Sequence, residues 1–417
     1  MLKPTPALVK RVYLVLMLFN TLATSFIWGI NTLFLLDAGL SNTEAFAVNA
    51  FFTVGQVLFE VPTGVIADTL GRRTSYLFGA VVLAMSTGLY LYAWNIGASF
   101  VLWAVSSVLL GLGYTFFSGA VEAWLVDALD EAGYKGDLDS VFAKGQIVAG
   151  VAMLTGSIAG GIIAQLTNLG VPYILRAGAL IINFFVAFFF MRDWGFTPTR
   201  SKKPLKDMKA IFNASIKYGI KDRPVRWVML IAPFTMGVGF YAFYAMQPYL
   251  LELYGDPNAY SVAGLAAAVI AGAQILGGVA VSYIRRMFKH RTSFFITNIV
   301  LGSLILAGIG LVNVFWAAVL LLVVWGVLFA AVMPIQQAYL NGLIPSKQRA
   351  TVLSFSSLIG SSGGIATQPL LGRVSDVYSF STSYVVGAGI TILALPFAIL
   401  AKNEKASSDK IQISKES

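Results

Sequence analysis

Two glutamates stand inside long apolar stretches, where an ionisable side chain is unusual. Glu60 lies eight residues before Asp68, about 12 Å along a helix, and Glu122 lies five residues before Asp127, about 7 Å. An isolated carboxylate in an apolar environment is costly to ionise, so it can hold a proton near neutral pH or pair with a cation. We therefore predict that Glu60 and Glu122 exchange protons or hold a cationic ligand. The alternative is that a protonated glutamate makes a structural hydrogen bond between helices.

A charged loop follows the first of these glutamates. It reads Gly64-Val-Ile-Ala-Asp68-Thr-Leu-Gly71-Arg72-Arg73. A carboxylate at a helix C-terminus opposes the helix dipole unless a cation pairs with it, and Arg72 and Arg73 can reach back to Asp68 from a glycine turn. Because Asp127 ends another apolar stretch at the same level, we predict an Asp–Arg–Asp cluster that holds one conformation and breaks in another. The alternative is an ordinary basic loop.

Residues for other kinds of chemistry are scarce. The sequence has no cysteine, and its one histidine, His290, lies among Arg286, Lys289 and Arg291, where it is poorly placed to act as a base. A soft-metal site needs several cysteine or histidine ligands, and the sequence contains no Gly-x4-Gly-Lys-Ser/Thr phosphate loop. We therefore expect no metal, no cofactor, no ATP-driven pump and no enzyme active site.

The elements that carry these residues are predicted to be helices that span a membrane. The sequence is 57% hydrophobic and 12% charged, which is about half the charged fraction of a soluble domain. Apolar stretches long enough to cross a bilayer recur along the whole chain, so the predicted fold class is an all-α membrane protein with twelve transmembrane helices. The expected spans are residues 12–36, 45–67, 75–95, 98–126, 141–166, 172–191, 227–252, 260–284, 292–312, 314–342, 351–372 and 381–401.

The basic residues set the predicted orientation. With the N-terminus in the cytoplasm, every Lys and Arg except Arg176 and Arg373 falls on the cytoplasmic side, which is the positive-inside pattern. This pattern explains the net charge of +10 without a nucleic-acid partner. The first apolar run has no small-residue cleavage site, so we expect it to be a retained span. We predict a multi-pass protein of the cytoplasmic membrane with both termini inside.

A long polar connector divides the chain. Residues 192–226 form a basic cytoplasmic linker between a predicted N-terminal six-helix bundle, residues 1–191, and a predicted C-terminal six-helix bundle, residues 227–401. Residues 402–417 are polar and are predicted to be a disordered cytoplasmic tail.

The two halves resemble copies of each other. Three segments repeat at offsets of 211 to 215 residues, which place Glu60 over Gln274, Glu122 over Gln337 and Arg176 over Gly387. An even repeat keeps its orientation, so an axis along the membrane normal relates the halves and a binding site is expected between them near mid-membrane. Only the first half has ionisable side chains at these positions. We therefore expect ion coupling or cation recognition in the first half and hydrogen bonding in the second.

The charged loop resembles the signature loop of the major facilitator superfamily, Gly-x-Leu-Ala-Asp-Arg-x-Gly-Arg-Arg. The matching residues are Gly64, Ala67, Asp68, Gly71, Arg72 and Arg73. The spans, the linker and the repeat extend the resemblance over residues 10–400, and it implies a six-plus-six helical fold, alternating access and a conformational latch at this loop. Thr69 stands where the family has a basic residue, so the latch is expected to lack one contact.

A run of small residues in the fifth expected span resembles the family's exporter signature, Gly-x3-Gly-Pro-x2-Gly-Gly. Ala152 stands at its first glycine and Ser157 at its proline. Small residues let helix backbones approach, so we predict that Gly156, Gly160 and Gly161 pack helices closely, and close packing alone explains the run equally well. The likeness to bacterial drug-efflux members is also incomplete at Ser107, where many drug/proton antiporters of the family carry arginine.

Polar and aromatic side chains on other spans are predicted to line a cavity for amphipathic ligands. They are Asn20, Trp28, Asn31, Gln56, Tyr241, Tyr244, Gln247, Gln274, Gln336, Gln337 and Gln368. Taken singly, each of the aromatic residues is more typical of a side chain that faces lipid or a neighbouring helix. Arg176, one turn into its span, is expected to pair with Asp37 or Glu44 or to extend toward the outer surface.

These expectations together favour a monomeric, proton-coupled antiporter that exports amphipathic small molecules, as multidrug efflux proteins do. Its expected partners are the substrate, protons and the lipid bilayer. A proton-coupled importer of a small organic solute would use the same fold. A receptor or structural membrane protein would not need paired carboxylates within the membrane.

Overall fold

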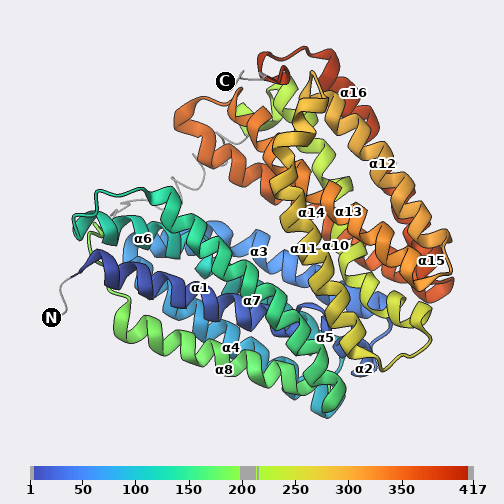
Figure 1. Cartoon of the computed structure of the whole chain (residues 1–417), viewed down its shortest axis with the longest axis horizontal. Helices are drawn as coiled ribbons and strands as arrows, with labels where there is room; N and C mark the ends of the chain where they lie inside the picture. The colour runs from blue at the N-terminus through green and yellow to red at the C-terminus, as the bar shows by residue number, and fades with distance from the viewer. Residues whose placement is uncertain (1–3, 198–212, 214–215, 412–417) are drawn as a thin grey trace. The chain divides into compact units, whose positions relative to one another are not determined.

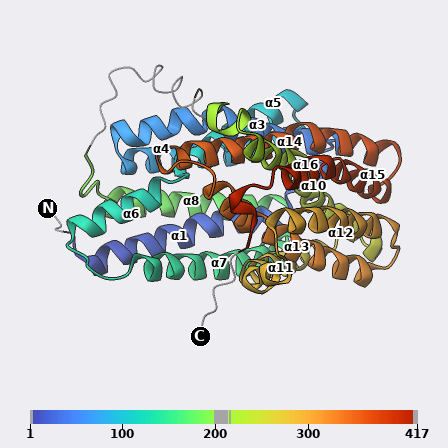
Figure 2. The same ribbon diagram turned by 90° about the horizontal axis from the view of Figure 1, so that it is seen from above.

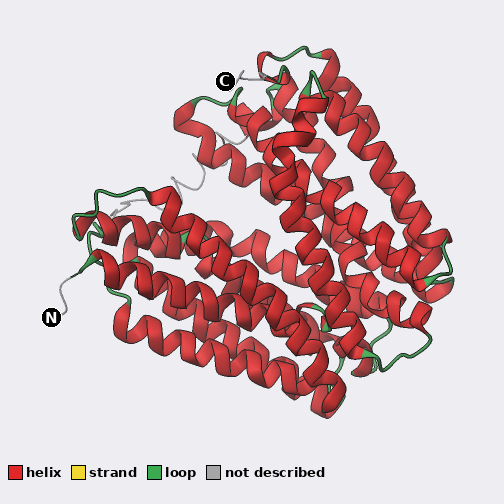
Figure 3. Ribbon diagram, viewed as in Figure 1, coloured by secondary structure: helices red, strands yellow, loops and turns green. Residues whose placement is uncertain are grey.

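The structure is a computed structural model that describes residues 4–197, 213 and 216–411. These residues form helices joined by short loops, and no strand occurs among them (Figure 3). Figure 1 labels the main helices in chain order. Those of the first half are α1 (Pro6–Trp28), α2 (Asn31–Asp37), α3 (Asn42–Leu70), α4 (Arg72–Ile96), α5 (Phe100–Phe117), α6 (Ala120–Glu131), α7 (Leu138–Leu166) and α8 (Gly170–Phe190). Those of the second half are α10 (Arg223–Tyr254), α11 (Tyr260–Ile284), α12 (Arg291–Leu311), α13 (Phe315–Asn341), α14 (Arg349–Val377), α15 (Phe380–Ile392) and α16 (Leu395–Asn403), with short 3-10 or π turns at η1 (Ile216–Ile220), η2 (Arg285–Met287), η3 (Ser346–Gln348) and η4 (Ser407–Asp409).

The apolar helices confirm the predicted class of an all-helical membrane protein. Eleven segments in the described part of the chain are long and apolar enough to cross a bilayer. A helix also occupies the remaining expected span, since residues 351–372 lie within the 29-residue helix α14. Its many Ser, Gly and Thr residues leave it outside the apolar set, so the count of twelve spans stays a prediction.

Three of the expected spans are broken helices. The first divides into α1 and α2 after Trp28, the fourth into α5 and α6 at Ser118 and Gly119, and the last into α15 and α16 after Ile392. At the second break Gly119 adopts a left-handed conformation, with φ 68°, which a residue with a side chain rarely adopts. A new helix N-terminus therefore begins within the candidate span Phe100–Glu131.

The chain divides into two compact units. Unit 1 comprises Met1–Leu40, Phe51–Pro204 and Asn258–Ala268, and unit 2 comprises Ser41–Ala50, Leu205–Pro257 and Val269–Ser417. The division differs from the predicted boundaries because the first residues of α3 belong to unit 2 and the first residues of α11 belong to unit 1.

Each unit has its own apolar core. In unit 1, α1 packs along α7 and α8, as Figures 1 and 2 show for α1 and α7, and Trp124 and Leu125 of α6 are buried in the core. In unit 2, α10 packs along α14 and α12 packs along α15, around Met229 and Tyr339.

The predicted disordered tail is ordered as far as Ile411, so this prediction is wrong for residues 402–411. The turn η4 places Asp409 in a buried position, where its carboxylate accepts hydrogen bonds from the backbone N–H and the hydroxyl of Thr292, at 2.8 and 3.0 Å. Polar composition suggested disorder, but these polar groups serve the start of α12. Residues 412–417 lie outside the described residues.

The small residues of α7 lie where neighbouring helices approach most closely. A Cβ atom added at Gly156 would meet Ser25 of α1, and one added at Gly160 would meet the Phe26 carbonyl. A Cβ atom at Gly161 would lie 2.8 Å from the Cα atom of Gly264, in the part of α11 that belongs to unit 1. All three predicted packing glycines therefore stand at close helix contacts.

We predict that Gly160→Ala destabilises unit 1. The added methyl group would collide with backbone that cannot move independently, and overpacking of this kind costs about 1–3 kcal/mol. The measurement is the thermal unfolding midpoint of the purified protein. The matched control is Gly178→Ala on α8, where an added Cβ meets no atom within 4 Å. Equal midpoints for the two variants would contradict the proposed packing.

Candidate functional site

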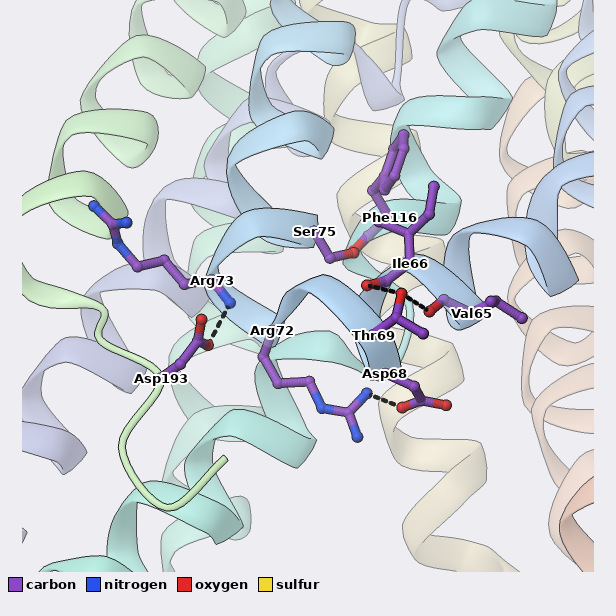
Figure 4. Close-up of polar contacts among 9 residues, drawn as sticks. All are labelled: Val65, Ile66, Asp68, Thr69, Arg72, Arg73, Ser75, Phe116 and Asp193. Atoms are coloured by element: carbon purple, nitrogen blue, oxygen red, sulfur yellow. Dashed lines mark hydrogen bonds and ion pairs between the residues drawn. The ribbon is translucent and has the colours of Figure 1, made fainter. Parts of the chain in front are cut away.

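The loop that begins α4 forms part of the predicted charge cluster (Figure 4). The Arg72 guanidinium lies 2.6 Å from the Asp68 carboxylate, so the predicted pairing at the end of α3 is present. The Asp68 side chain is 52% exposed, and such a pair contributes at most about 1 kcal/mol. Thr69 turns back on its own helix, because its hydroxyl donates to the Val65 carbonyl at 2.8 Å. Because this ion pair contributes so little to stability, it can break and reform easily.

The second arginine of the loop has a different partner from the predicted one. Arg73 donates from its guanidinium to the Phe188 carbonyl at 2.7 Å and lies over the Phe188 ring. This places a cation at the C-terminus of α8, where the helix dipole favours it. In the described part of the chain no ion pair joins Arg72 or Arg73 to Asp127, so the third member of the predicted Asp–Arg–Asp cluster stays a prediction.

An aspartate that the sequence did not single out completes the loop. Asp193, three residues beyond α8, accepts a hydrogen bond from the Arg73 backbone N–H at 2.8 Å (Figure 4). It caps the N-terminus of α4 from another segment, because the residue at the cap position is Gly71, which has no side chain. Gly71 has φ 107°, and a Cβ atom there would collide with the Asp193 carboxylate. The signature glycine therefore makes room for this cap.

Unit 2 repeats the arrangement. Asp409, which follows α16, caps α12 through Thr292, and Arg291 at the start of α12 donates to the Ser408 and Lys410 carbonyls. Asp193 and Asp409 are 216 residues apart (409 − 193), an offset close to that of the sequence repeat. Each half thus fixes its third expected span to the segment that follows its sixth.

The first predicted glutamate contacts the break between α5 and α6. The Ser118 hydroxyl donates to Glu60 Oε1 at 2.8 Å. Ser118 and Gly119 are exposed, and Glu60 is half-buried. The contact is a hydrogen bond between helix segments, and it also leaves the carboxylate accessible for a proton or a cation.

The second predicted glutamate lies just beyond the same break. Glu122 is in the first turn of α6 and is half-buried. The N-terminus of a helix favours negative charge, and no side chain caps this one, since the cap residue is Gly119. Both glutamates therefore lie at the same helix break in unit 1.

Arg176 is fully buried in unit 1, so the predicted pairing with Asp37 or Glu44 and the outward extension are wrong. Its guanidinium donates to the Thr87 hydroxyl and to the Ala23 carbonyl, both at 3.0 Å, and lies 5.9 Å from the centre of the Tyr114 ring. Its Nη2 has no hydrogen-bond partner within the described residues.

The two expected acidic partners of this arginine are engaged elsewhere. Asp37 accepts from Trp94, and Glu44 accepts from Ser41. Arg176 is therefore a buried cation that is held by neutral groups.

Unit 2 contains a cavity of about 200 Å³ among α10, α11, α12, α13 and α15. Its walls include the rings of Trp325 and Phe329, which stack with centroids 5.1 Å apart, and the side chains of Gln274, Asn298 and Gln336. A smaller cavity beside it, of about 60 Å³, is lined by Gln336 and Gln337. Of the predicted lining residues, three from the second half thus border internal space.

The other predicted lining residues are buried or half-buried. Asn31, Tyr241, Gln247 and Gln368 are buried, whereas Asn20, Trp28, Gln56 and Tyr244 are half-buried. Tyr241 donates to Ser383 at 2.5 Å, and Asn31 accepts from Tyr173 at 2.9 Å. The Tyr241 contact matches the alternative interpretation, in which the aromatic residues pack against neighbouring helices.

A further aspartate caps the start of α3. Asp376, at the end of α14, accepts from the backbone N–H groups of Asn42 and Thr43, at 2.9 and 2.8 Å, and from the Thr43 hydroxyl. Ser41 and Glu44 complete the cap by bonding each other's backbone N–H. These residues all belong to unit 2, whereas α3 from Phe51 onward belongs to unit 1. The sequence signal for this contact was weak, since a lone Asp near a span end is common.

The chain resembles known proteins in sequence and in fold. The family model described as Major Facilitator Superfamily matches residues 13–367. The chain is 22% identical over 381 residues to the MFS-type transporter YxaM of Bacillus subtilis (strain 168), covering 88% of this chain and 90% of that protein. It is 26% identical over 337 residues to the multidrug resistance protein MdtG of Salmonella typhimurium (strain LT2), covering 79% of this chain and 78% of that protein.

Two solved structures have a similar fold. The nucleoside transporter NupG has a TM-score of 0.76 at 12% identity, covering 95% of this chain and 99% of that chain. A bacterial homologue of the human lysosomal transporter Spinster has a TM-score of 0.73 at 14% identity, covering 99% of this chain and 100% of that chain. At such identities these likenesses show a common fold.

We predict a pH-dependent effect at the Asp193 cap. Burial raises the pKa of the Asp193 carboxyl above its ordinary value, against the lowering effect of the N–H groups and charges of Arg73 and Arg72. The stabilisation linked to a raised pKa is complete below the unfolded-state pKa and is lost as the pH rises through the folded-state pKa. Asparagine is neutral, as the protonated aspartate is, so it avoids the cost of a buried charge. At neutral pH, Asp193→Asn should therefore be at least as stable as the unmodified protein. The difference in stability between the two should shrink toward about pH 4, where the aspartate takes up its proton.

Unfolding midpoints across this pH range provide the measurement. Asp193→Ala, which removes the hydrogen-bond acceptor, should lower the free energy of unfolding by about 1 kcal/mol. Asp130→Asn is the matched control, because it neutralises an exposed carboxylate on α6. An advantage of Asp193→Asn that grows as the pH falls would contradict the assigned cause.

We also predict that Asp376 and Thr43 are energetically coupled. Asp376→Ala should lower the free energy of unfolding by about 1 kcal/mol, as loss of a helix cap does. In a double-mutant cycle with Thr43→Ala, the two losses should not add, because both variants remove the same hydrogen bond. Glu252→Gln, at an exposed carboxylate of α10, is the control. Additive losses would show that the two residues do not interact.

Proposed function

Because the chain belongs to the Major Facilitator Superfamily, we propose that it is a secondary transporter that works by alternating access. Its multiple apolar helices support a multi-pass membrane protein. We further propose twelve spans, with α14 as the eleventh, both termini in the cytoplasm and the cytoplasmic membrane as its location. A polar α14 is consistent with a span that is shielded from lipid by other helices.

The observation that carries the coupling proposal is the helix break at Ser118. It brings Glu60 into a hydrogen bond with Ser118, and it places Glu122 in the first turn of the next half-helix. Half-helix N-termini within a membrane are a recurring feature of transporter ion and substrate sites. We propose that Glu60 and Glu122 bind and release protons there, and that a deprotonated glutamate attracts a cationic substrate.

The proposed direction is export of amphipathic small molecules. The support is the distant relative MdtG, which is named a multidrug resistance protein. A proton-coupled importer is the second candidate, because the chain also has the fold of the nucleoside transporter NupG and of a D-xylose–proton symporter. The proposed cycle of the exporter begins with substrate entering from the cytoplasm as protons leave the glutamates. The units then rearrange, and protons from outside displace the substrate.

The loop of Asp68 and Arg72 and the cap of Asp376 are proposed to hold different states of this cycle. An exposed ion pair of this kind contributes at most about 1 kcal/mol. Contacts of this size can bias two conformations without locking either one. The proposed latch therefore acts as a bias, and protonation of the glutamates supplies the switching free energy.

The direction of coupling can be measured in proteoliposomes with ethidium as an amphipathic cation. With an acidic interior, protons leave down their gradient, so an antiporter should accumulate external ethidium. A symporter should accumulate its solute only when the exterior is acidic. Accumulation that follows neither gradient would contradict proton coupling.

We predict that Glu60→Gln combined with Glu122→Gln reduces pH-driven ethidium uptake to the level of protein-free liposomes. Glutamine keeps the size and a hydrogen-bond acceptor for Ser118 but cannot release a proton. Ethidium exchange at equal pH should fall as well, because glutamine is neutral like the protonated glutamates and does not attract a cation. Asp130→Asn is the matched control. Full pH-driven uptake by the double variant would contradict the proposed coupling mechanism.

A further inference from the structure

We propose that the cavity of unit 2 binds a neutral, planar heteroaromatic group with a lactam-like edge, which carries one hydrogen-bond donor beside one acceptor. This group would be the uncharged end of the transported molecule, so the assignment of the cavity as a substrate subsite rests on the proposed function. The binding itself does not depend on transport and can be tested alone.

The size and walls of the cavity fit a bicyclic aromatic group. Its volume of about 200 Å³ lies among five helices of one unit. Trp325 and Phe329 are tilted by only 28° from each other on α13, and both rings border the cavity. Flat aromatic walls favour offset stacking with a flat ligand. Ligand pockets typically combine such apolar walls with a few fixed polar groups.

The polar groups of the cavity are uncharged. No Asp, Glu, Lys, Arg or His belongs to the described residues that line it. A charged group would lose its hydration there without an opposite charge to replace it. The cavity therefore selects a neutral group, whereas the carboxylates of the proposed coupling site are all in unit 1.

Three carboxamides around the cavity have unused hydrogen-bonding capacity. Neither Gln274 nor Gln336 has a hydrogen-bond partner among the described residues, and Oδ1 of Asn298 is buried without one. A buried acceptor that lacks a partner is unfavourable, so a ligand group that donates to it gains from filling this need. A carboxamide presents an acceptor beside a donor, so the complementary ligand edge carries a donor beside an acceptor. This pattern is the basis for the lactam-like edge.

A buried glycine offers a way to fill the cavity. Gly302 of α12 lines it and is buried, yet an added Cβ atom meets no atom within 4 Å. A larger side chain at this position would extend into the empty space. Gly278 of α11 has the same freedom from contacts but is exposed, so Gly278→Leu is a matched control for Gly302→Leu.

The test measures binding of two neutral probes to the purified full chain by isothermal titration calorimetry. The probes are 2-quinolone, which carries the lactam edge, and N-methyl-2-quinolone, in which the donor is blocked. Wild type should bind 2-quinolone about tenfold more tightly than the methylated probe, since one hydrogen bond is lost. Asn298→Leu should weaken 2-quinolone binding about tenfold and should leave the methylated probe within about twofold.

The cavity variants decide where the probe binds. Gly302→Leu should abolish binding of both probes, and Gly278→Leu should match wild type. The proposal is overturned if wild type does not bind 2-quinolone, if Gly302→Leu binds it normally, or if Asn298→Leu weakens both probes equally. If Gly302→Leu does not fold, Gly302→Ala with the Asn298 comparison decides instead. Binding without ethidium transport would leave the cavity site intact and refute only the proposed function.

Discussion

The start of a helix in this protein is held by a carboxylate from a distant segment, and much of the structure depends on that interaction. The first N–H groups of a helix have no partner within the helix. Asp193 supplies the acceptor for α4, and Asp409 supplies it for α12. Each cap joins a helix start to the segment that follows another expected span of the same half. The glycine of the signature loop follows from this constraint, because Gly71 leaves room for Asp193.

The two helix caps are a structural counterpart of the sequence repeat, but the two halves differ in their chemistry. Unit 1 contains Glu60, Glu122 and the buried Arg176, all outside unit 2. Unit 2 has carboxamides, Gln274 and Gln337, at the positions that match the two glutamates, and both line its cavities. A common framework therefore carries ionisable groups in one copy and neutral hydrogen-bonding groups in the other. The predicted division of roles, ion coupling in the first half and hydrogen bonding in the second, depends on this difference.

Length and hydropathy predicted the helices well, because an apolar run of sufficient length has few other solutions in a bilayer. They could not predict the break at Gly119, since a Ser-Gly pair inside an apolar run is equally compatible with a continuous helix. They also misjudged the caps. Asp193 and Asp409 lie in polar segments whose composition is typical of loops, and only the folded chain shows that each reaches a helix N-terminus. The pairing of Asp68 with Arg72 was predictable because it is local, whereas the partner of Arg73 depends on tertiary packing.

Arg176 was the least predictable residue, and its environment bears on the proposed coupling. Neutral oxygens and the Tyr114 ring surround its guanidinium, and no carboxylate of the described residues forms an ion pair with it. Under the proposed mechanism, the three ionisable residues Glu60, Glu122 and Arg176 carry a net charge of +1 when both glutamates are protonated. Loss of one proton makes this group neutral, and loss of the second makes it negative. A cationic substrate is then favoured only after deprotonation, because like charge repels it before that step. Within the proposed mechanism, the positive charge of Arg176 therefore disfavours a cation while both glutamates are protonated.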